Sequence, residues 1–183
     1  MEIENFILIS AEELKRSAGV IFVAAVVIMA FLWSAVGNKK ENGKIRILKL
    51  FILSFSISLI LSMTIFGRER NLSEQSFEWH FLWSYIEAAN GNRALALQIA
   101  ANILLFIPFG AALPMNFNRF HRIYYTAAAA FAFSASVEIF QGVTAMGLFE
   151  FDDMLSNTLG AAVGFLIYAG AKKLYMAAKE RLK

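Results

Sequence analysis

The chain has 183 residues, of which 58% are hydrophobic and only 17% are charged. A soluble domain of this length needs charged faces to stay dissolved, and here the apolar residues instead form long unbroken runs. The chain contains no cysteine, which excludes disulfides and thiolate metal sites. Its basic excess is confined to the flanks of the apolar runs and to the C-terminal tail, so nucleic-acid binding is not indicated.

Five apolar runs are long enough to cross a bilayer, which takes roughly 20 residues of helix at 1.5 Å each. They cover residues 18–36, 47–66, 94–114, 123–143 and 154–171. The sequence therefore predicts an all-α fold, an integral membrane bundle of five transmembrane helices. We expect one membrane domain over residues 18–175, preceded by an outer tail or interfacial helix at 1–17 and followed by a basic cytoplasmic tail at 176–183.

The distribution of Lys and Arg predicts the orientation of the spans, because short cytoplasmic loops carry an excess of both residues. The segments expected on one side, residues 38–46, 115–122 and 172–183, hold eleven of them, and the segments on the other side hold five. We therefore expect the N-terminus outside and the C-terminus inside the cell membrane.

The segment between the second and third spans, SFEWHFLWSYIEA, carries five aromatic side chains from Phe77 to Tyr85. Aromatic rings favour the headgroup region of a membrane, where a ring is half buried and its polar edge stays wet. We expect an interfacial helix or loop that covers the outer mouth of the bundle. A lid that contacts a substrate is the sharper alternative.

Small residues at helical spacing predict close packing between helices. Gly160 and Gly164 form a GxxxG pair in the fifth span, and Ser54, Ser58 and Ser62 repeat every four residues in the second. Small side chains on one stripe let helix backbones approach closely in lipid. We assign these residues to a compact bundle and no chemistry to them.

Polar side chains from four spans are expected in the same outer half of the membrane. Glu138 lies about 8 Å below the outer end of the fourth span, and Asn102 lies about 12 Å below that of the third. A charged carboxylate at membrane depth costs about 3 kcal/mol, so Glu138 is expected to face a partner or a water-filled cavity. The candidate residues are Arg68, Asn102, Glu138, Gln141, Asp152, Asp153 and Asn157.

Two further readings of these polar residues stay open. They could form a buried hydrogen-bonded network that locks the helix ends, with at least one of Asp152 and Asp153 capping the fifth helix. Carboxylate and amide oxygens are also ligands that Mg²⁺ or Ca²⁺ prefers, but the spacing DDxxxN matches no calcium loop. His80 and His121 are expected on opposite sides of the membrane, which argues against zinc. We predict no metal and no cofactor.

Three ordered segments are similar to the signature segments of VanZ-like membrane proteins. They are NILLFIPFG at residues 102–110, VEIFQ at 137–141 and FEFDDMLSNTLGAAVG at 149–164. TIFGR, which ends at Arg68, and the aromatic FLWSY of residues 81–85 also resemble the family. The resemblance implies a protein of the bacterial cell membrane, with functional positions at the candidate residues named above. Many members have an arginine shortly before the Phe-Asp segment, where this chain reads MGLFEF, and Glu150 replaces the more usual aspartate.

Two hypotheses about function follow. The namesake of the family is associated with low-level teicoplanin resistance, which implies an envelope protein whose outward polar pocket binds a membrane lipid, a lipid-linked cell-wall component or the lipid-bearing drug. The alternative is a membrane hydrolase or transferase acting on a lipid or lipid-linked sugar, with Glu138 as general acid or base and Asp153 orienting a partner or an attacking water. Both hypotheses stay open on the sequence, as does the oligomeric state.

Overall fold

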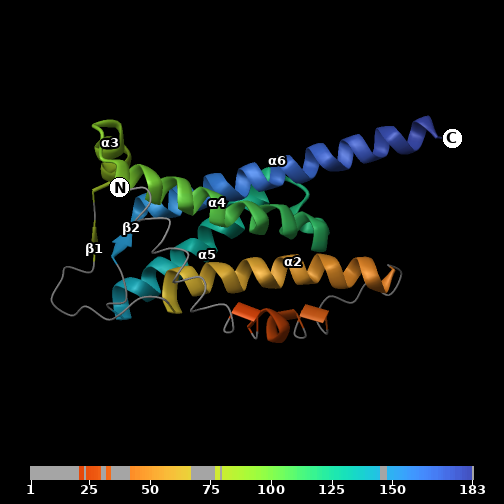
Figure 1. Ribbon diagram of the computed structural model, residues 1–183, viewed down its shortest axis with the longest axis horizontal. Coiled ribbons are helices and arrows are strands. Elements are labelled where there is room, and N and C mark those ends of the chain that lie inside the picture. Colours follow the sequence, from red (N-terminus) through yellow and green to blue (C-terminus); the bar gives the residue numbers. More distant parts are fainter. Residues whose placement is uncertain are drawn as a thin grey trace.

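Four long helices dominate the fold (Figure 1). The structure, a computed structural model, describes residues 21–22, 24–29, 32–33, 42–66, 77–78, 80–144 and 148–182. In chain order the labelled elements are α2 (Gly43–Leu61), the π-helical turn η1 (Ser62–Phe66), β1 (Phe77–Glu78), α3 (Trp83–Ala89), α4 (Arg93–Asn116), η2 (Asn118–Phe120), α5 (Ile123–Thr144), β2 (Phe149–Glu150) and α6 (Phe151–Arg181).

Within the described residues, four segments are long and apolar enough to cross a membrane, namely Gly43–Ile65, Arg93–Asn116, Ile123–Thr144 and Phe151–Arg181. They match the second to fifth predicted spans, of which the second extends one residue further, so the all-α membrane bundle is confirmed as a class. The first predicted span, residues 18–36, lies mostly outside the described residues, and its described parts at 21–22, 24–29 and 32–33 are helical. The first span, and with it the total of five, stays a prediction, as does the orientation in the membrane.

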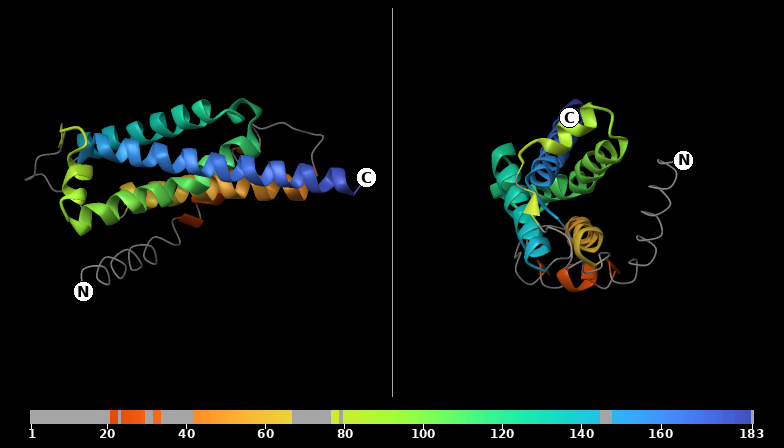
Figure 2. Two further views of the ribbon diagram at one scale, coloured as in Figure 1. Left: turned by 90° about the horizontal axis from the view of Figure 1, so that it is seen from above. Right: turned by 90° about the vertical axis from the view of Figure 1, so that its left-hand side faces the viewer.

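The four spanning helices alternate in direction. Helices α2 and α5 run from the right of Figure 1 to the left, whereas α4 and α6 run from left to right. One end of the bundle, here called the acidic end, therefore gathers η1, the end of α5, β2 and the starts of α4 and α6. The opposite, basic end gathers the starts of α2 and α5, the η2 turn and the C-terminal half of α6, as the view from above in Figure 2 also shows.

A two-stranded sheet, which the sequence did not predict, lies at the acidic end. Strands β1 and β2 pair in parallel, with Phe77 opposite Phe149 and Glu78 opposite Glu150. The pairing ties the segment after the second span to the residues that begin α6. It is two residues long in each strand because β2 runs directly into α6.

Helix α4 is the centre of the bundle, because it packs against α2, α3, α5 and α6. The apolar core is built around it from Leu53 and Ile60 of α2, Ala130 of α5 and Ala161 of α6. On α4 itself the core residues are Phe106, Phe109, Ala112 and Leu113. The serine stripe of α2 also faces inward, and the Ser54 hydroxyl donates to the carbonyl of Leu50 at 2.7 Å.

The GxxxG pair of α6 packs against the backbone of α4. A Cβ atom at Gly160 would overlap the carbonyl oxygen of Ile103, and one at Gly164 would overlap that of Ile107. The two helices therefore approach with no side chain between them, which maximises dispersion contacts in lipid. The predicted role of this pair in helix packing agrees with these contacts, and the partner is α4 of the same chain.

Replacing either glycine by alanine is expected to destabilise the bundle. Gly160→Ala and Gly164→Ala force α4 and α6 apart, so each should lower the free energy of unfolding by about 1–3 kcal/mol. Titration of the purified protein from mild detergent into dodecyl sulfate measures this quantity.

Gly170→Ala is the matched control on the same helix, because nothing lies within 4 Å of its added Cβ. It should leave the free energy unchanged or raise it by up to about 1 kcal/mol, the helix-propensity gain of alanine. Equal losses in all three variants would contradict the proposed α4–α6 contact.

Candidate functional site

Asp152 joins the start of α6 to the start of α3. Its carboxylate is 1% exposed. Oδ1 accepts the backbone N–H of Leu82 at 2.7 Å, and Oδ2 accepts the backbone N–H and the hydroxyl of Ser84 at 2.9 and 2.7 Å. Hydrogen bonds to an ionised acceptor are the strong ones in proteins. Asp152 therefore caps the neighbouring helix α3.

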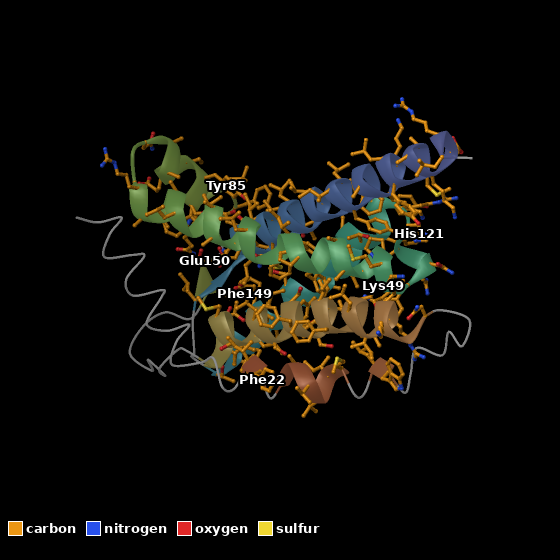
Figure 3. All side chains as sticks on the ribbon, turned by 45° about the vertical axis from the view of Figure 1, so that its right-hand side comes forward. Phe22, Lys49, Tyr85, His121, Phe149 and Glu150 are labelled. Carbon is orange, nitrogen blue, oxygen red and sulfur yellow. The ribbon has the colours of Figure 1, made fainter. Side chains whose placement is uncertain are left out.

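The hydrogen bonds to Asp152 explain the backbone conformation of Leu82, the residue directly before α3. Leu82 has φ of 63°, a left-handed conformation that a leucine adopts only when its surroundings hold it there. A second contact, 2.7 Å between the Tyr85 and Ser156 hydroxyls, fixes the next turn of α3 to α6. The aromatic segment is thus partly helical and attached at the acidic end, as Figure 3 shows for Tyr85.

The alternative that at least one of Asp152 and Asp153 caps α6 is not met by Asp152, whose side chain bonds to the start of α3. The residue that precedes α6 is Glu150, and its side chain makes no capping hydrogen bond. Asp152 and Asp153 lie inside the first turn, where the helix dipole still favours their charge. Their side chains bond to α3 and α4 instead, so both residues connect helices.

Gln98 of α4 lies between two carboxylates. Its Nε2 donates to Oε2 of Glu150 at 3.2 Å and to Oδ1 of Asp153 at 3.3 Å. One amide nitrogen carries two hydrogens, so it can serve both acceptors at once. This arrangement brings two acidic side chains together beside α4, at the end where Figure 3 labels Glu150.

Glu138 of α5 is 3% exposed and faces the same end of the bundle. Its Oε2 accepts the backbone N–H of Glu150 at 3.0 Å. Glu150 thus supplies a backbone donor to Glu138 and, through its side chain, accepts from Gln98, so it joins α5 to α4.

Gln141, one turn beyond Glu138, joins α5 to the π-helical turn η1. Its Nε2 donates to the carbonyl oxygen of Thr64 at 2.7 Å, and its side chain is 2% exposed. A π-turn leaves backbone carbonyls out of the regular helical ladder, and such turns are frequent at functional sites. Arg68 follows Thr64 by four residues in the sequence and lies outside the described residues.

Asn157 and Asn102 retain unused hydrogen-bonding capacity. Asn157 is 4% exposed and donates through Nδ2 to the Ser134 hydroxyl at 2.8 Å, which ties α6 to α5. Within the described part of the chain, its Oδ1 and the Nδ2 of Asn102 are buried and have no partner. Gln98 faces Asp153 and Ile103 faces Gly160, so this register places the two asparagines at one level of the α4–α6 pair.

The structure thus brings six of the seven candidate residues to the acidic end, and the seventh, Arg68, is not described. Asp152 is engaged with α3, Gln141 with η1, and Glu138, Asp153, Asn157 and Asn102 lie around the starts of α4 and α6. Sequence reasoning missed Gln98 and gave Glu150 no role. The i, i+4 spacing of Gln98 and Asn102 was a usable signal, because it places two amides on one face of an apolar helix.

No group of three or more His, Asp or Glu side chains in the described ranges has the arrangement of a metal site. The acidic side chains that lie close together are instead bonded to amide and backbone donors. What the geometry offers is a set of hydrogen-bond acceptors and amide groups at one end of a membrane bundle.

Comparison with protein families identifies the family of this chain. The model of the family described as VanZ/LLP1 matches residues 18–172. The chain belongs to the VanZ/LLP1 family. No curated protein and no solved structure gives a significant match. With its four apolar helices, this VanZ-family chain is a multi-pass membrane protein, and the acidic end lies within the matched residues.

Substituting Asp152 should release α3 from the bundle. Asp152→Asn replaces an acceptor oxygen by an NH₂ group, which costs about 1.5–3 kcal/mol for a hydrogen bond to a charged acceptor. The amide hydrogens of Leu82 and Ser84 should then exchange with deuterium about tenfold faster or more. Hydrogen exchange read by mass spectrometry over residues 80–90 measures the change.

Asp153→Asn is the control, because Asp153 is the next residue on α6 and bonds to Gln98 of α4. Its exchange pattern over α3 should match the wild type. Unchanged protection of Leu82 and Ser84 in Asp152→Asn would show that α3 is held by other contacts.

Proposed function

We propose that the acidic end of this VanZ-family protein binds the sugar-bearing headgroup of a lipid-linked cell-envelope component or of a lipid-bearing glycopeptide. Binding there would lower the amount of drug that reaches its target at the membrane surface. This activity would contribute to resistance of the teicoplanin type.

The observation that carries the proposal is the mixture of groups gathered at one level of the bundle. Glu150 and Asp153 offer carboxylate oxygens, and Asn102 and Asn157 offer an amide donor and an amide acceptor that are buried and unpaired among the described residues. Sugar hydroxyls donate and accept hydrogen bonds at once, so they complement such a mixture better than a purely apolar or purely ionic ligand does.

The surroundings of these groups support an amphiphilic ligand. Large apolar side chains near the acidic end point away from the bundle, including Leu104, Val143 and Leu159, which are 66%, 76% and 52% exposed. In a membrane these faces contact acyl chains. If a ligand's headgroup is held at the starts of α4 and α6, its lipid chain can lie along these exposed apolar faces. The chain would then stay outside the protein.

The sequence suggests a cation for the proposed site at Arg68, which lies outside the described residues. It follows η1 by two residues, and η1 is bonded to Gln141 at the acidic end. A guanidinium there would hold the phosphate that joins a sugar to its lipid carrier, because its planar fork matches phosphate oxygens.

The proposal predicts loss of protection when the carboxylates are neutralised. A teicoplanin-sensitive Gram-positive host expressing the wild type should require more drug for inhibition than the empty host. Glu138→Gln and Asp153→Asn, at matched membrane levels, should return the inhibitory concentration to the value of the empty host.

Ser136→Ala is the control on the same helix as Glu138, because Ser136 is exposed and bonds only to the Ala132 carbonyl of its own helix among the contacts described. It should protect as well as the wild type does. Full protection by Glu138→Gln and Asp153→Asn would return both residues to a purely structural role, and no protection by the wild type would refute the resistance part of the proposal.

Lipid analysis separates binding from the alternative, an enzyme with Glu138 as general acid or base. A binding protein leaves the chemical composition of the membrane lipids unchanged, so mass spectra from cells expressing wild type and Glu138→Gln should contain the same species. A lipid or lipid-linked sugar that appears with the wild type and disappears with Glu138→Gln would establish catalysis instead.

A further inference from the structure

A groove runs along the C-terminal half of α6, at the opposite end of the bundle from the proposed headgroup site. Its volume is about 530 Å³. One stripe of α6 and a single residue of the loop after η2 line it: Phe165, Tyr168, Ala169, Lys172, Lys173, Met176, Ala177 and Glu180, together with His121. Figure 3 shows His121 at this end, beside α6.

The groove lies where α6 leaves the bundle. Gly164 is the last buried residue of α6 in the described chain. Beyond it, the Tyr168 hydroxyl lies 3.3 Å from Nε2 of His121, and the Tyr168 ring stacks on the imidazole with 6.2 Å between ring centroids. The same Nε2 lies 3.1 Å from the carbonyl oxygen of Pro114, so the loop, the end of α4 and α6 meet there.

We place the edge of the membrane at this meeting point by counting residues from the start of α6. From Phe151 to Tyr168 the helix rises about 26 Å at 1.5 Å per residue, close to the roughly 30 Å of a hydrocarbon core. Tyrosine is enriched at that boundary. Lys172 and Lys173 are one turn further along α6 and therefore at headgroup level, whereas Phe165 faces the hydrocarbon.

The lining of the groove changes from apolar to charged along α6, toward its C-terminus. Phe165, Tyr168 and Ala169 give an apolar part beside the hydrocarbon, and Ala169 and Ala177 leave space because their side chains are small. Lys172 and Lys173 then supply two ammonium groups, against one carboxylate at Glu180. Arg119 of η2 and Arg122 of the loop after it add positive charge at the same end.

We propose that this groove is a binding site for an anionic phospholipid of the surrounding bilayer, with its phosphate at Lys172 and Lys173 and an acyl chain against Phe165 and Ala169. Charge complementarity selects an anionic headgroup, and the apolar part of the groove selects a lipid over a free phosphate. The site lies at the basic end and is independent of the proposed headgroup site at the acidic end.

Native mass spectrometry of the purified full chain in detergent tests the proposal. Phosphatidylglycerol and phosphatidylcholine with identical acyl chains are added in turn, and the fraction of protein that retains one lipid is measured. The wild type should retain phosphatidylglycerol in preference. The double variant Lys172→Gln/Lys173→Gln should weaken that retention by on the order of tenfold, as expected for the loss of two charges at a membrane surface.

The pair Lys179→Gln/Arg181→Gln is the matched control, because it removes the same charge from the same helix at residues that do not line the groove. It should leave retention within about twofold of the wild type, and Lys172→Arg/Lys173→Arg should preserve it. Thermal unfolding without added lipid verifies that each variant is folded. Equal weakening by both glutamine pairs, equal retention of the two lipids, or displacement of the lipid by inorganic phosphate would overturn the proposal.

Discussion

The close approach of α4 and α6 is the constraint on which the rest of the structure depends. Gly160 and Gly164 of α6 lie against the backbone of α4, and Gly110 of α4 lies against the backbone of Ala161. Glycines on both helices remove the side chains that would separate them, so the contact also fixes how far one helix is shifted along the other. That register places Gln98 opposite Asp153, and the acidic end follows from it.

The carboxylates at the acidic end have different roles because they accept hydrogen bonds from different donors. Asp152 receives three hydrogen bonds from Leu82 and Ser84 at the start of α3, which attach the aromatic segment to α6. Glu150 and Asp153 meet at the amide of Gln98, a neutral donor on the central helix. A fully satisfied buried network of this kind specifies one arrangement of helices.

Much of the fold was predictable because a membrane imposes simple rules on sequence. Apolar runs of about twenty residues have one regular structure available in lipid, so the second to fifth spans could be located from residue type alone. The packing role of the GxxxG pair was likewise predictable, because only small residues allow two helix backbones to come into contact. The short β1–β2 pairing was not readable, since two residues in each strand carry no periodic pattern.

The convergence of polar residues on one end was predictable from depth, but their partners were not. Counting residues along each span put Glu138, Asn102 and Asn157 at similar heights, and the structure gathers them there. Rotation about each helix axis decides which side chains meet, and apolar sequence on all sides of a helix does not encode it. Hence Gln98 was overlooked, and the contact of the Asp152 carboxylate with the start of α3 was not predicted.

Photo-crosslinking with a lipid-linked sugar that carries a diazirine on its sugar tests the central claim most directly, namely that the acidic end holds a headgroup. Peptide mapping of the illuminated complex should find the label on the starts of α4 and α6, at or beside Gln98, Asn102 and Asp153, and excess unlabelled lipid-linked sugar should compete it away. Label confined to the basic end, or spread along all lipid-facing helices without competition, would contradict the account.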